Sequence, residues 1–111
     1  MSRKRAGPSG KAEKRIDETS YLTGRRRGAV LKEEAWYEGN MLVRYSLAYI
    51  NACICPADNG RVLGYDNAHG HSHRNFMGKT ESVKFPGYEA LVNRFQKEVE
   101  ALWRAEDEEK S

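Results

Sequence analysis

The stretch of sequence that decides the fold is residues 41–55, MLVRYSLAYINACIC. Its odd positions are mostly large and apolar, as at Tyr45 and Leu47, whereas its even positions include Arg44 and Ser46. An apolar face that repeats every second residue is typical of a β-strand with one side against a core. We therefore expect a long strand here, and its even side also becomes apolar toward residue 55.

Turn-forming residues bound this strand on both sides. Residues 38–40, EGN, predict a hairpin before it, and residues 56–60, PADNG, end it with strong turn chemistry. A polar loop that contains glycine is expected over residues 67–73. The other strands that the pattern predicts are residues 29–37, 61–66 and 75–85, the last of them bent at Gly78.

A helix is predicted after Pro86, from about Tyr88 to Arg104. Apolar side chains recur there at helical spacing, at positions Tyr88, Leu91, Val92, Phe95, Val99, Leu102 and Trp103. Because a helix with so apolar a face needs a sheet to cover, we expect an α+β fold. This fold has an antiparallel sheet of about four strands, with one amphipathic C-terminal helix packed across it.

Charge is distributed unevenly along the 111 residues. Residues 1–28 contain nine lysines and arginines against three acidic side chains, which leaves a net charge of +6. We expect a flexible, disordered basic arm over residues 1–28, a single domain over 29–104 and an acidic tail over 105–111. The arm has two interpretations: a solvated tail, or a nucleic-acid contact through Lys4, Arg5, Arg25, Arg26 and Arg27.

The cysteines and the apolar segments bear on the compartment. The chain has two cysteines, Cys53 and Cys55, which are too few for a disulfide framework. No apolar segment follows the basic N-terminus as in a signal peptide, and no run approaches the ~20 residues of a membrane span. We expect a cytoplasmic protein with free thiols and no membrane partner.

All three histidines of the chain lie in residues 64–74, GYDNAHGHSHR. The groups in this segment that carry chemistry are Asp66, His69, His71, His73 and Arg74. Histidine is the one side chain whose unperturbed pKa lies near neutrality. The segment begins in a short predicted strand and continues into a loop, so these side chains can converge.

Acid–base cleavage of a phosphodiester is the first interpretation of this segment. A metal-free ribonuclease needs a base for the 2′-hydroxyl proton, an acid for the leaving 5′-oxygen and a cation for the phosphorane charge. His71 and His73 would supply base and acid, and Arg74 the cation. Asp66 would orient one imidazole.

Two other interpretations of the segment stay open. His69, His71 and His73, with Asp66, match the ligands that zinc or nickel prefers, although no distant histidine or Cys-x-x-Cys completes a structural site. A divalent metal is therefore the cofactor that this interpretation adds, whereas the first needs none. The last interpretation is a polar, exposed loop whose histidines are incidental.

Four segments in order carry a resemblance to a known family. They are Val43-Arg44-Tyr45-Ser46-Leu47-Ala48-Tyr49, Tyr65-Asp66-Asn67, His73-Arg74 and Tyr88-Glu89-Ala90-Leu91. Over about residues 29–103, the chain resembles the TumE family, small toxin-like proteins of bacterial and archaeal toxin–antitoxin modules. Asp66, His73 and Arg74 match the family motif. Asn75 stands where the family often has a second histidine, a role for which His69 and His71 are the substitutes.

The resemblance implies a function and partners. It implies a toxin that acts on RNA, here a metal-independent endoribonuclease, and a cognate antitoxin with a DNA-binding helix-turn-helix. A second copy of the chain, in a homodimer, is the other partner that we consider. The alternative is a non-catalytic module that binds nucleic acid or a protein partner, with the basic arm supplying most of the affinity.

Overall fold

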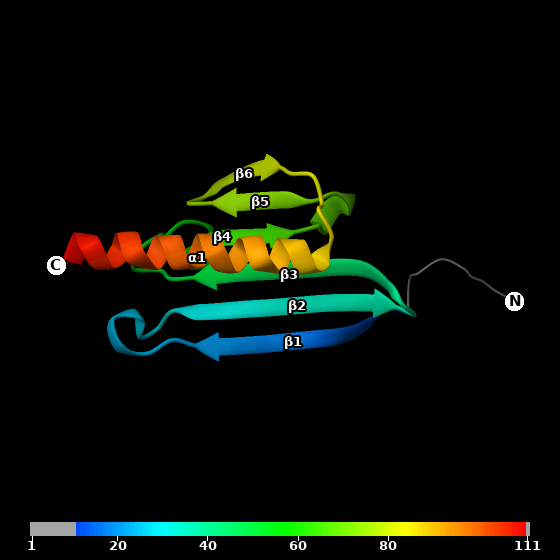
Figure 1. Ribbon diagram of the computed structural model, residues 1–111, viewed down its shortest axis with the longest axis horizontal. Coiled ribbons are helices and arrows are strands. Elements are labelled where there is room, and N and C mark those ends of the chain that lie inside the picture. The colour runs from blue at the N-terminus through cyan, green and yellow to red at the C-terminus, as the bar shows by residue number, and fades with distance from the viewer. Residues whose placement is uncertain (1–10, 111) are drawn as a thin grey trace, which may run out of the picture.

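The computed structural model describes residues 11–110, which form an antiparallel sheet and one long helix (Figure 1). The elements are β1 (Glu13–Tyr21), β2 (Val30–Glu38), β3 (Met41–Ile50), β4 (Arg61–Asp66), β5 (His73–Phe76), β6 (Lys79–Ser82) and α1 (Tyr88–Lys110). The predicted α+β class, with one C-terminal helix on an antiparallel sheet, is confirmed. No helix among residues 11–110 combines the length and the apolar character that crossing a membrane requires.

The sheet has six strands in the order β1-β2-β3-β4-β5-β6, so each strand pairs with its neighbours in sequence. The prediction of about four strands was wrong in two places. One extra strand comes from residues 75–85, which form parts of β5 and β6 instead of one bent strand. Met77 and Gly78 have φ values of +52° and +85°, and such a two-residue turn reverses the chain.

The other extra strand is β1, within residues 1–28, which the sequence predicted to be a flexible arm. β1 pairs with β2 from Glu13 opposite Tyr37 to Tyr21 opposite Val30. Nearly all of its side chains are exposed, so backbone pairing holds it to the sheet edge. Its charged residues are typical of an edge strand that avoids pairing with other chains. The part of the predicted arm before residue 11 lies outside the described residues.

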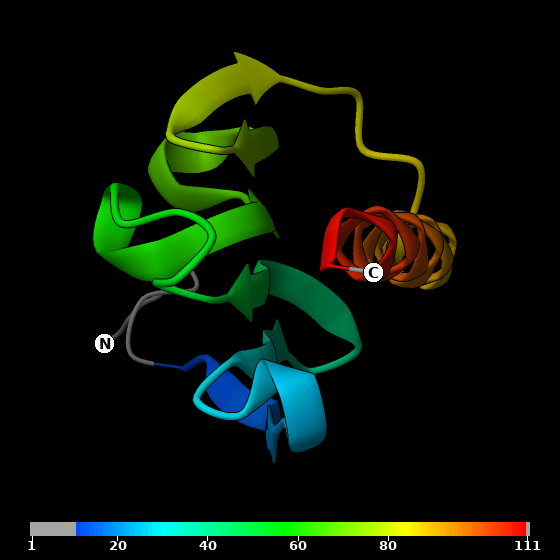
Figure 2. The same cartoon turned by 90° about the vertical axis from the view of Figure 1, so that its left-hand side faces the viewer.

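α1 lies along one side of the sheet, over β3 and β4 (Figures 1 and 2). The core forms between them from buried side chains of the sheet and the helix, among them Tyr45, Leu47, Tyr49, Leu63, Tyr65, Leu91, Phe95 and Val99. The predicted acidic tail over residues 105–111 is helical as far as Lys110, because α1 continues through it. Glu106 and Asp107 form ion pairs with Arg26, which supports this last part of the helix.

β3 is shorter than the strand predicted over residues 41–55. It ends at Ile50 because Asn51 begins a turn: its carbonyl accepts the N–H groups of Ile54 and Cys55, both at 3.0 Å. The Asn51 side-chain oxygen also accepts the N–H of Cys53 at 3.1 Å. Cys53 is exposed and Cys55 is buried, and both thiols are free.

The sheet has a second face, which α1 does not cover. Side chains alternate along a strand, so the neighbours of the core tyrosines point to this side. On β3 these are Arg44 and Ser46, and on β4 the residue is Asp66. On β5, His73 and Asn75 point to the same side, because they pair with Asp66 and Gly64 of β4. We call this side the helix-free face.

Candidate functional site

A pocket of about 340 Å³ lies on the helix-free face, where β3, β4, β5 and β6 meet the loop after β4. Its volume is in the range of small-molecule sites, about 300–1,000 Å³. The charged, imidazole and amide side chains that line it are Arg44, Arg61, Asp66, His69, His73 and Asn75. Asp66, His69 and His73 of the histidine segment therefore border this pocket, whereas His71 and Arg74 do not line it.

The strand register explains which residues meet there. Asp66 at the end of β4 is paired with His73 at the start of β5, and residues directly opposite share one face of a sheet. Tyr65 and Arg74 form the neighbouring pair and point to the helix side. The structure thus brings Asp66 and His73 together and separates Arg74 from both.

Asp66 is fully engaged by neighbouring groups. Its Oδ1 accepts the N–H of Ala68 at 3.0 Å, and its Oδ2 accepts a hydrogen bond from Asn75 Nδ2 at 3.1 Å. Arg61 Nη1 lies 3.5 Å from the same Oδ2. Among residues 11–110 no hydrogen bond joins Asp66 to an imidazole, so Asp66 positions Arg61 and the loop instead of a histidine.

The loop that carries the histidines is tied to β3 at two points. The Asn67 side chain accepts the N–H of Tyr45 at 2.9 Å and donates to the carbonyl of Val43 at 3.1 Å, in place of a strand residue. The buried Tyr45 hydroxyl donates to Ser72 Oγ at 2.6 Å. Burial raises the pKa of Tyr45, so this phenol stays a neutral donor at neutral pH. Both ends of the loop are therefore held in place.

The exposed tip of the loop carries His69, whose φ is +67°, a conformation that few non-glycine residues adopt. His69 lines the pocket next to His73. His71 is also exposed, but it lies against His73, with ring centroids 4.2 Å apart at an interplanar angle of 51°. The three histidines are thus close together, but His69 and His73 line the pocket, whereas His71 packs on the ring of His73.

His73 stands out because both of its ring nitrogens are buried and neither has a hydrogen-bond partner among the described residues. A buried polar group without a partner costs about 1–3 kcal/mol of stability. Native structures keep such groups rarely, and a catalytic role is one of the usual reasons. His73 is therefore the strongest candidate for a functional side chain at the pocket.

Arg74 lies on the helix side of the sheet, where it forms ion pairs. Its Nη2 and Nε donate to Glu98 Oε2 at 2.7 and 3.2 Å, and its Nη1 donates to Glu81 at 3.1 Å. The Tyr65 hydroxyl donates to the other oxygen of Glu98. This guanidinium is thus committed to joining β5 to α1.

The cations of the pocket are Arg44 and Arg61, which the sequence analysis did not propose as site residues. The sequence pattern could have indicated Arg44, because it alternates with the core residues of β3 and so points to the opposite face. For Arg61 no signal existed, because strand alternation from Leu63 places it on the helix side. A register shift opposite Tyr49 and Ile50 leaves Val62 unpaired, and Arg61 then reaches Asp66 on the helix-free face.

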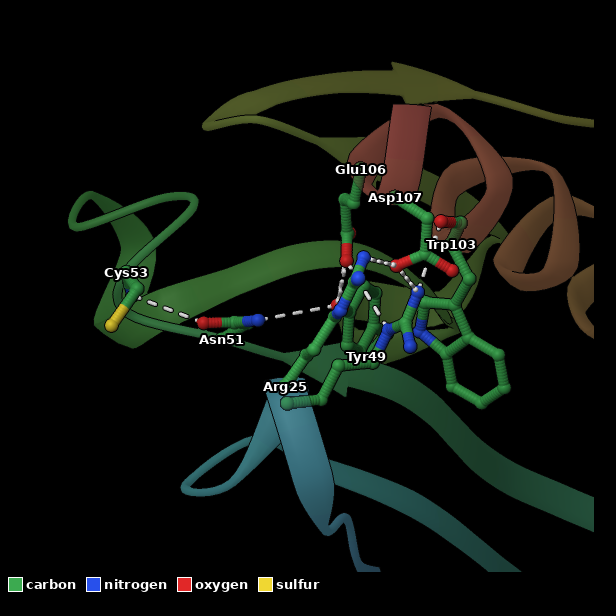
Figure 3. Close-up of polar contacts among 8 residues, drawn as sticks. Arg25, Tyr49, Asn51, Cys53, Trp103, Glu106 and Asp107 are labelled. Atoms are coloured by element: carbon green, nitrogen blue, oxygen red, sulfur yellow. Dashed lines mark hydrogen bonds and ion pairs between the residues drawn. The ribbon is translucent and has the colours of Figure 1, made fainter. Parts of the chain in front are cut away.

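The basic residues of the proposed nucleic-acid contact have different surroundings. Arg26 Nη2 donates to the carbonyl of Trp103 and to Asp107 Oδ1, both at 2.9 Å, and its guanidinium lies 4.8 Å from the Trp103 ring centroid. Arg25 also approaches this end of the helix, with its Nη1 3.8 Å from Asp107 Oδ1 (Figure 3). Arg26 therefore anchors the end of α1.

Arg27, in contrast, is exposed and lies at the rim of a small pocket with Cys53. Two further members of the proposed contact, Lys4 and Arg5, lie outside the described residues. Arg25 and Arg27 are thus the exposed members of the group within residues 11–110, and Arg25 also lies near Asp107.

The metal interpretation lacks a ligand set in the described part of the chain. Among residues 11–110, no group of three or more histidine, cysteine or acidic side chains is arranged to hold a metal ion. His69, His71 and His73 do not gather into such a group, since His71 turns toward the His73 ring and away from the pocket lining.

The resemblance to the TumE family stays a prediction. No family model, curated protein or solved structure matches the chain.

Proposed function

We propose that the protein is a metal-independent endoribonuclease, the toxin component of a toxin–antitoxin pair, and that the pocket on the helix-free face is its active site. The observation that supports this best is the half-buried His73 imidazole, whose two ring nitrogens are buried without a hydrogen-bond partner in the described residues, beside two arginines. An imidazole and guanidinium groups around one pocket are the groups that RNA cleavage without a metal requires.

The proposed reaction is an intramolecular transfer. A base removes the proton of a 2′-hydroxyl, and the 2′-oxygen then attacks the adjacent phosphorus in line with the leaving group. The bond from phosphorus to the 5′-oxygen breaks, and an acid gives that oxygen its proton. The products are a 2′,3′-cyclic phosphate and a 5′-hydroxyl, and this step consumes no water.

Arg44 and Arg61 are the cations in this proposal. Arg61 holds the scissile phosphate and stabilises the charge that develops on it in the transition state, and Arg44 binds the neighbouring phosphate. Asp66 holds Arg61 in position through the contact at 3.5 Å. Arg74 has no part in the chemistry because its donors are bonded to Glu81 and Glu98 on the other face.

His73 and His69 are the proposed proton-transfer pair. In-line attack places the entering and leaving oxygens on opposite sides of the phosphorus, so the base and the acid must flank the phosphate. His69 lines the pocket together with His73, whereas His71 is not part of the lining and packs on the His73 ring, with centroids 4.2 Å apart. Exposed side chains change rotamer within nanoseconds, and His71 turns away when substrate reaches His73.

The test is cleavage of a fluorescent RNA oligonucleotide by purified protein in the presence of EDTA. His73→Ala is expected to lower kcat by roughly 10²–10⁴-fold, the usual contribution of a positioned acid or base. Arg61→Ala is expected to lower it by roughly 10²–10³-fold. Arg94→Ala, an exposed arginine of α1, is the matched control and retains full activity.

Two further readouts identify the mechanism. The product carries a 2′,3′-cyclic phosphate, and a substrate with a 2′-deoxy nucleotide at the cleavage position is not cut. His69→Ala loses activity like His73→Ala, whereas His71→Ala retains it. Absence of cleavage of any RNA by the wild-type protein, or equal cleavage by His73→Ala, would overturn the proposal.

The toxin part of the proposal is tested in growing cells. Expression of the wild-type chain is expected to arrest growth, and expression of His73→Ala is not. Co-expression of an antitoxin with a DNA-binding domain, from the gene next to this one, restores growth. Growth arrest by the wild type and His73→Ala alike would show that toxicity does not depend on the pocket.

A non-catalytic nucleic-acid-binding module is the second candidate, and Arg44 favours it. This exposed guanidinium stacks on Trp36 at 4.9 Å, and within residues 11–110 it forms no ion pair with a carboxylate. The module predicts RNA binding that weakens steeply with salt and that survives His73→Ala without any cleavage.

A further inference from the structure

Three side chains form a row on the helix-free face, from the sheet edge to the pocket. Lys14 on β1 is paired with Trp36 on β2, and Trp36 is paired with Arg44 on β3. Lys14 Nζ lies 5.2 Å from the centroid of the Trp36 ring, and the guanidinium carbon of Arg44 lies 4.9 Å from it. Since Arg44 also lines the pocket, the row ends at the proposed active site.

Irregular strand pairing surrounds Trp36 on both sides. On β1, Arg15 is an extra residue between the partners of Trp36 and Ala35, and on β3, Val43 is an extra residue beside Arg44. Bulges re-aim side chains and are common next to functional sites. Trp36 also lies outside the hydrophobic core cluster, so packing of the core does not explain a large aromatic side chain on this face.

The two cations of the row differ in charge balance. Lys14 Nζ forms ion pairs with Glu34 at 2.6 Å and with Asp17 at 3.3 Å, so its charge is compensated. Arg44 is exposed and has no ion pair with a carboxylate among residues 11–110. The positive charge that is free to meet a phosphate therefore lies at the pocket end of the row, next to the aromatic ring.

We propose that this row binds the nucleotides beside the scissile phosphate of a single-stranded RNA. Arg44 leaves the Trp36 ring and binds the neighbouring phosphate, and an unpaired base stacks on the ring face that becomes free. Trp36 is two strand spacings, about 10 Å, from β4, so the stacked base belongs to a nucleotide near the cleavage position. Stacking on an aromatic side chain requires an unpaired base, which excludes a duplex.

This inference rests on the proposed function of the pocket, and it is tested by binding, apart from cleavage. In a Trp103→Phe background Trp36 is the single tryptophan, because the chain has two. The probe is an eight-nucleotide RNA with 2′-O-methyl groups, which the proposed reaction cannot cut. We expect saturable quenching of the Trp36 fluorescence by this RNA and much weaker binding of the same sequence as a duplex.

A pair of matched variants separates the two faces of the sheet. Tyr37 follows Trp36 in the sequence and points to the helix side. A cation lies over its ring too, since the Arg15 guanidinium carbon is 5.4 Å from the ring centroid. Trp36→Ala is expected to weaken binding of the labelled RNA by roughly 5- to 150-fold, and Tyr37→Ala to leave it unchanged. Trp36→Phe retains most of the affinity because a phenyl ring also stacks on a base.

Arg44→Ala gives an independent measurement, with Arg15→Ala as its control. Loss of one phosphate contact to a single strand is expected to reduce the slope of log K against log salt by about 0.7. Circular dichroism verifies that each variant is folded before binding is compared.

The outcomes separate this inference from the proposed function. Quenching without any cleavage of normal RNA supports the row and overturns the active site. Cleavage whose KM is the same for Trp36→Ala and wild type, with no quenching of Trp36, overturns the row and leaves the active site. Equal binding of single-stranded and duplex RNA overturns the stacking.

Discussion

Arg74 and Glu98 join β5 to α1 through two hydrogen bonds, from Nη2 at 2.7 Å and from Nε at 3.2 Å, to the same carboxylate oxygen. The preceding residue, His73, lies on the opposite face of the sheet and borders the pocket. Two residues that are adjacent in the sequence, and that together looked like one catalytic group, therefore belong to different faces.

Arg74→Ala is expected to lower the free energy of unfolding and to leave RNA cleavage by the folded protein unchanged. Removal of the guanidinium leaves the half-buried Glu98 carboxylate without its cation, which costs about 1–3 kcal/mol. Urea denaturation measures the loss, and Arg104→Ala, exposed on the same helix, is the control with little effect. If Arg74→Ala has wild-type stability but does not cleave RNA, Arg74 takes part in the reaction.

Much of the fold was readable from the sequence because apolar patterns carried it. The strand through Tyr45, Leu47 and Tyr49 and the amphipathic C-terminal helix both have such patterns. β1 has none: Ile16 is its one half-buried side chain, so nothing distinguished this edge strand from a basic arm. Edge pairing through backbone groups leaves no periodic signal.

The site was readable only in part, for two physical reasons. A loop was predicted through His73, whereas β5 begins there, and without the strand the alternation that separates His73 from Arg74 did not apply. The unpaired Val62 then moved Arg61 out of phase with the rest of β4. A bulge depends on pairing with another strand, so the local sequence does not reveal it.

Gly64→Ala tests the position of Arg61. A Cβ at residue 64 would lie 2.6 Å from Arg61 Cδ and 3.3 Å from the carbonyl oxygen of Leu47. The flexible arginine side chain is the group that yields, so it is displaced from Asp66 and from the pocket. We expect cleavage to fall to the level of Arg61→Ala while most of the stability is retained.

The control for Gly64→Ala is the double variant with Arg61→Ala, which lacks the flexible side chain that the new methyl group would displace. Measured kcat values should not differ between Arg61→Ala and the double variant, because residues that act through one contact are not additive. Wild-type cleavage by Gly64→Ala would contradict the proposed role of Arg61.

Alanine substitutions of the neighbours Arg26 and Arg27 are expected to have different effects, one on stability and the other on RNA binding. Arg26→Ala removes the bonds to Trp103 and Asp107, so the end of α1 should exchange its amide hydrogens faster and the protein should unfold at lower urea. Arg27→Ala removes an exposed charge, so stability should be unchanged and RNA affinity should fall with a smaller salt dependence. Hydrogen exchange and binding at two salt concentrations measure the two effects. Equal loss of RNA affinity in both folded variants would assign Arg26 to the nucleic-acid contact.

Alkaline pH is expected to destabilise the fold through its buried tyrosines. Burial is the main cause that raises the pKa of Tyr45, Tyr49, Tyr65 and Tyr88 in the folded protein. In the unfolded chain a phenol ionises with a pKa of about 10, so above that pH the unfolded state binds fewer protons than the folded state. The free energy of unfolding should therefore be independent of these groups below pH 9 and fall as the pH rises past 10. The slope is about 1.4 kcal/mol per pH unit for each phenol that stays protonated in the fold.

Urea denaturation at a series of pH values from 8 to 11 measures this slope, and phenolate absorbance at 295 nm reports ionisation. Tyr88→Phe removes one titrating group together with its hydrogen bond to Glu33 at 2.7 Å. This variant should be less stable at pH 8, yet its stability should decline less steeply above pH 10, because the difference in bound protons is smaller by one. A less stable variant with an unchanged slope would mean that Tyr88 ionises in the folded protein. Ionisation of all tyrosines at 295 nm before any loss of circular dichroism would contradict the prediction for the whole group.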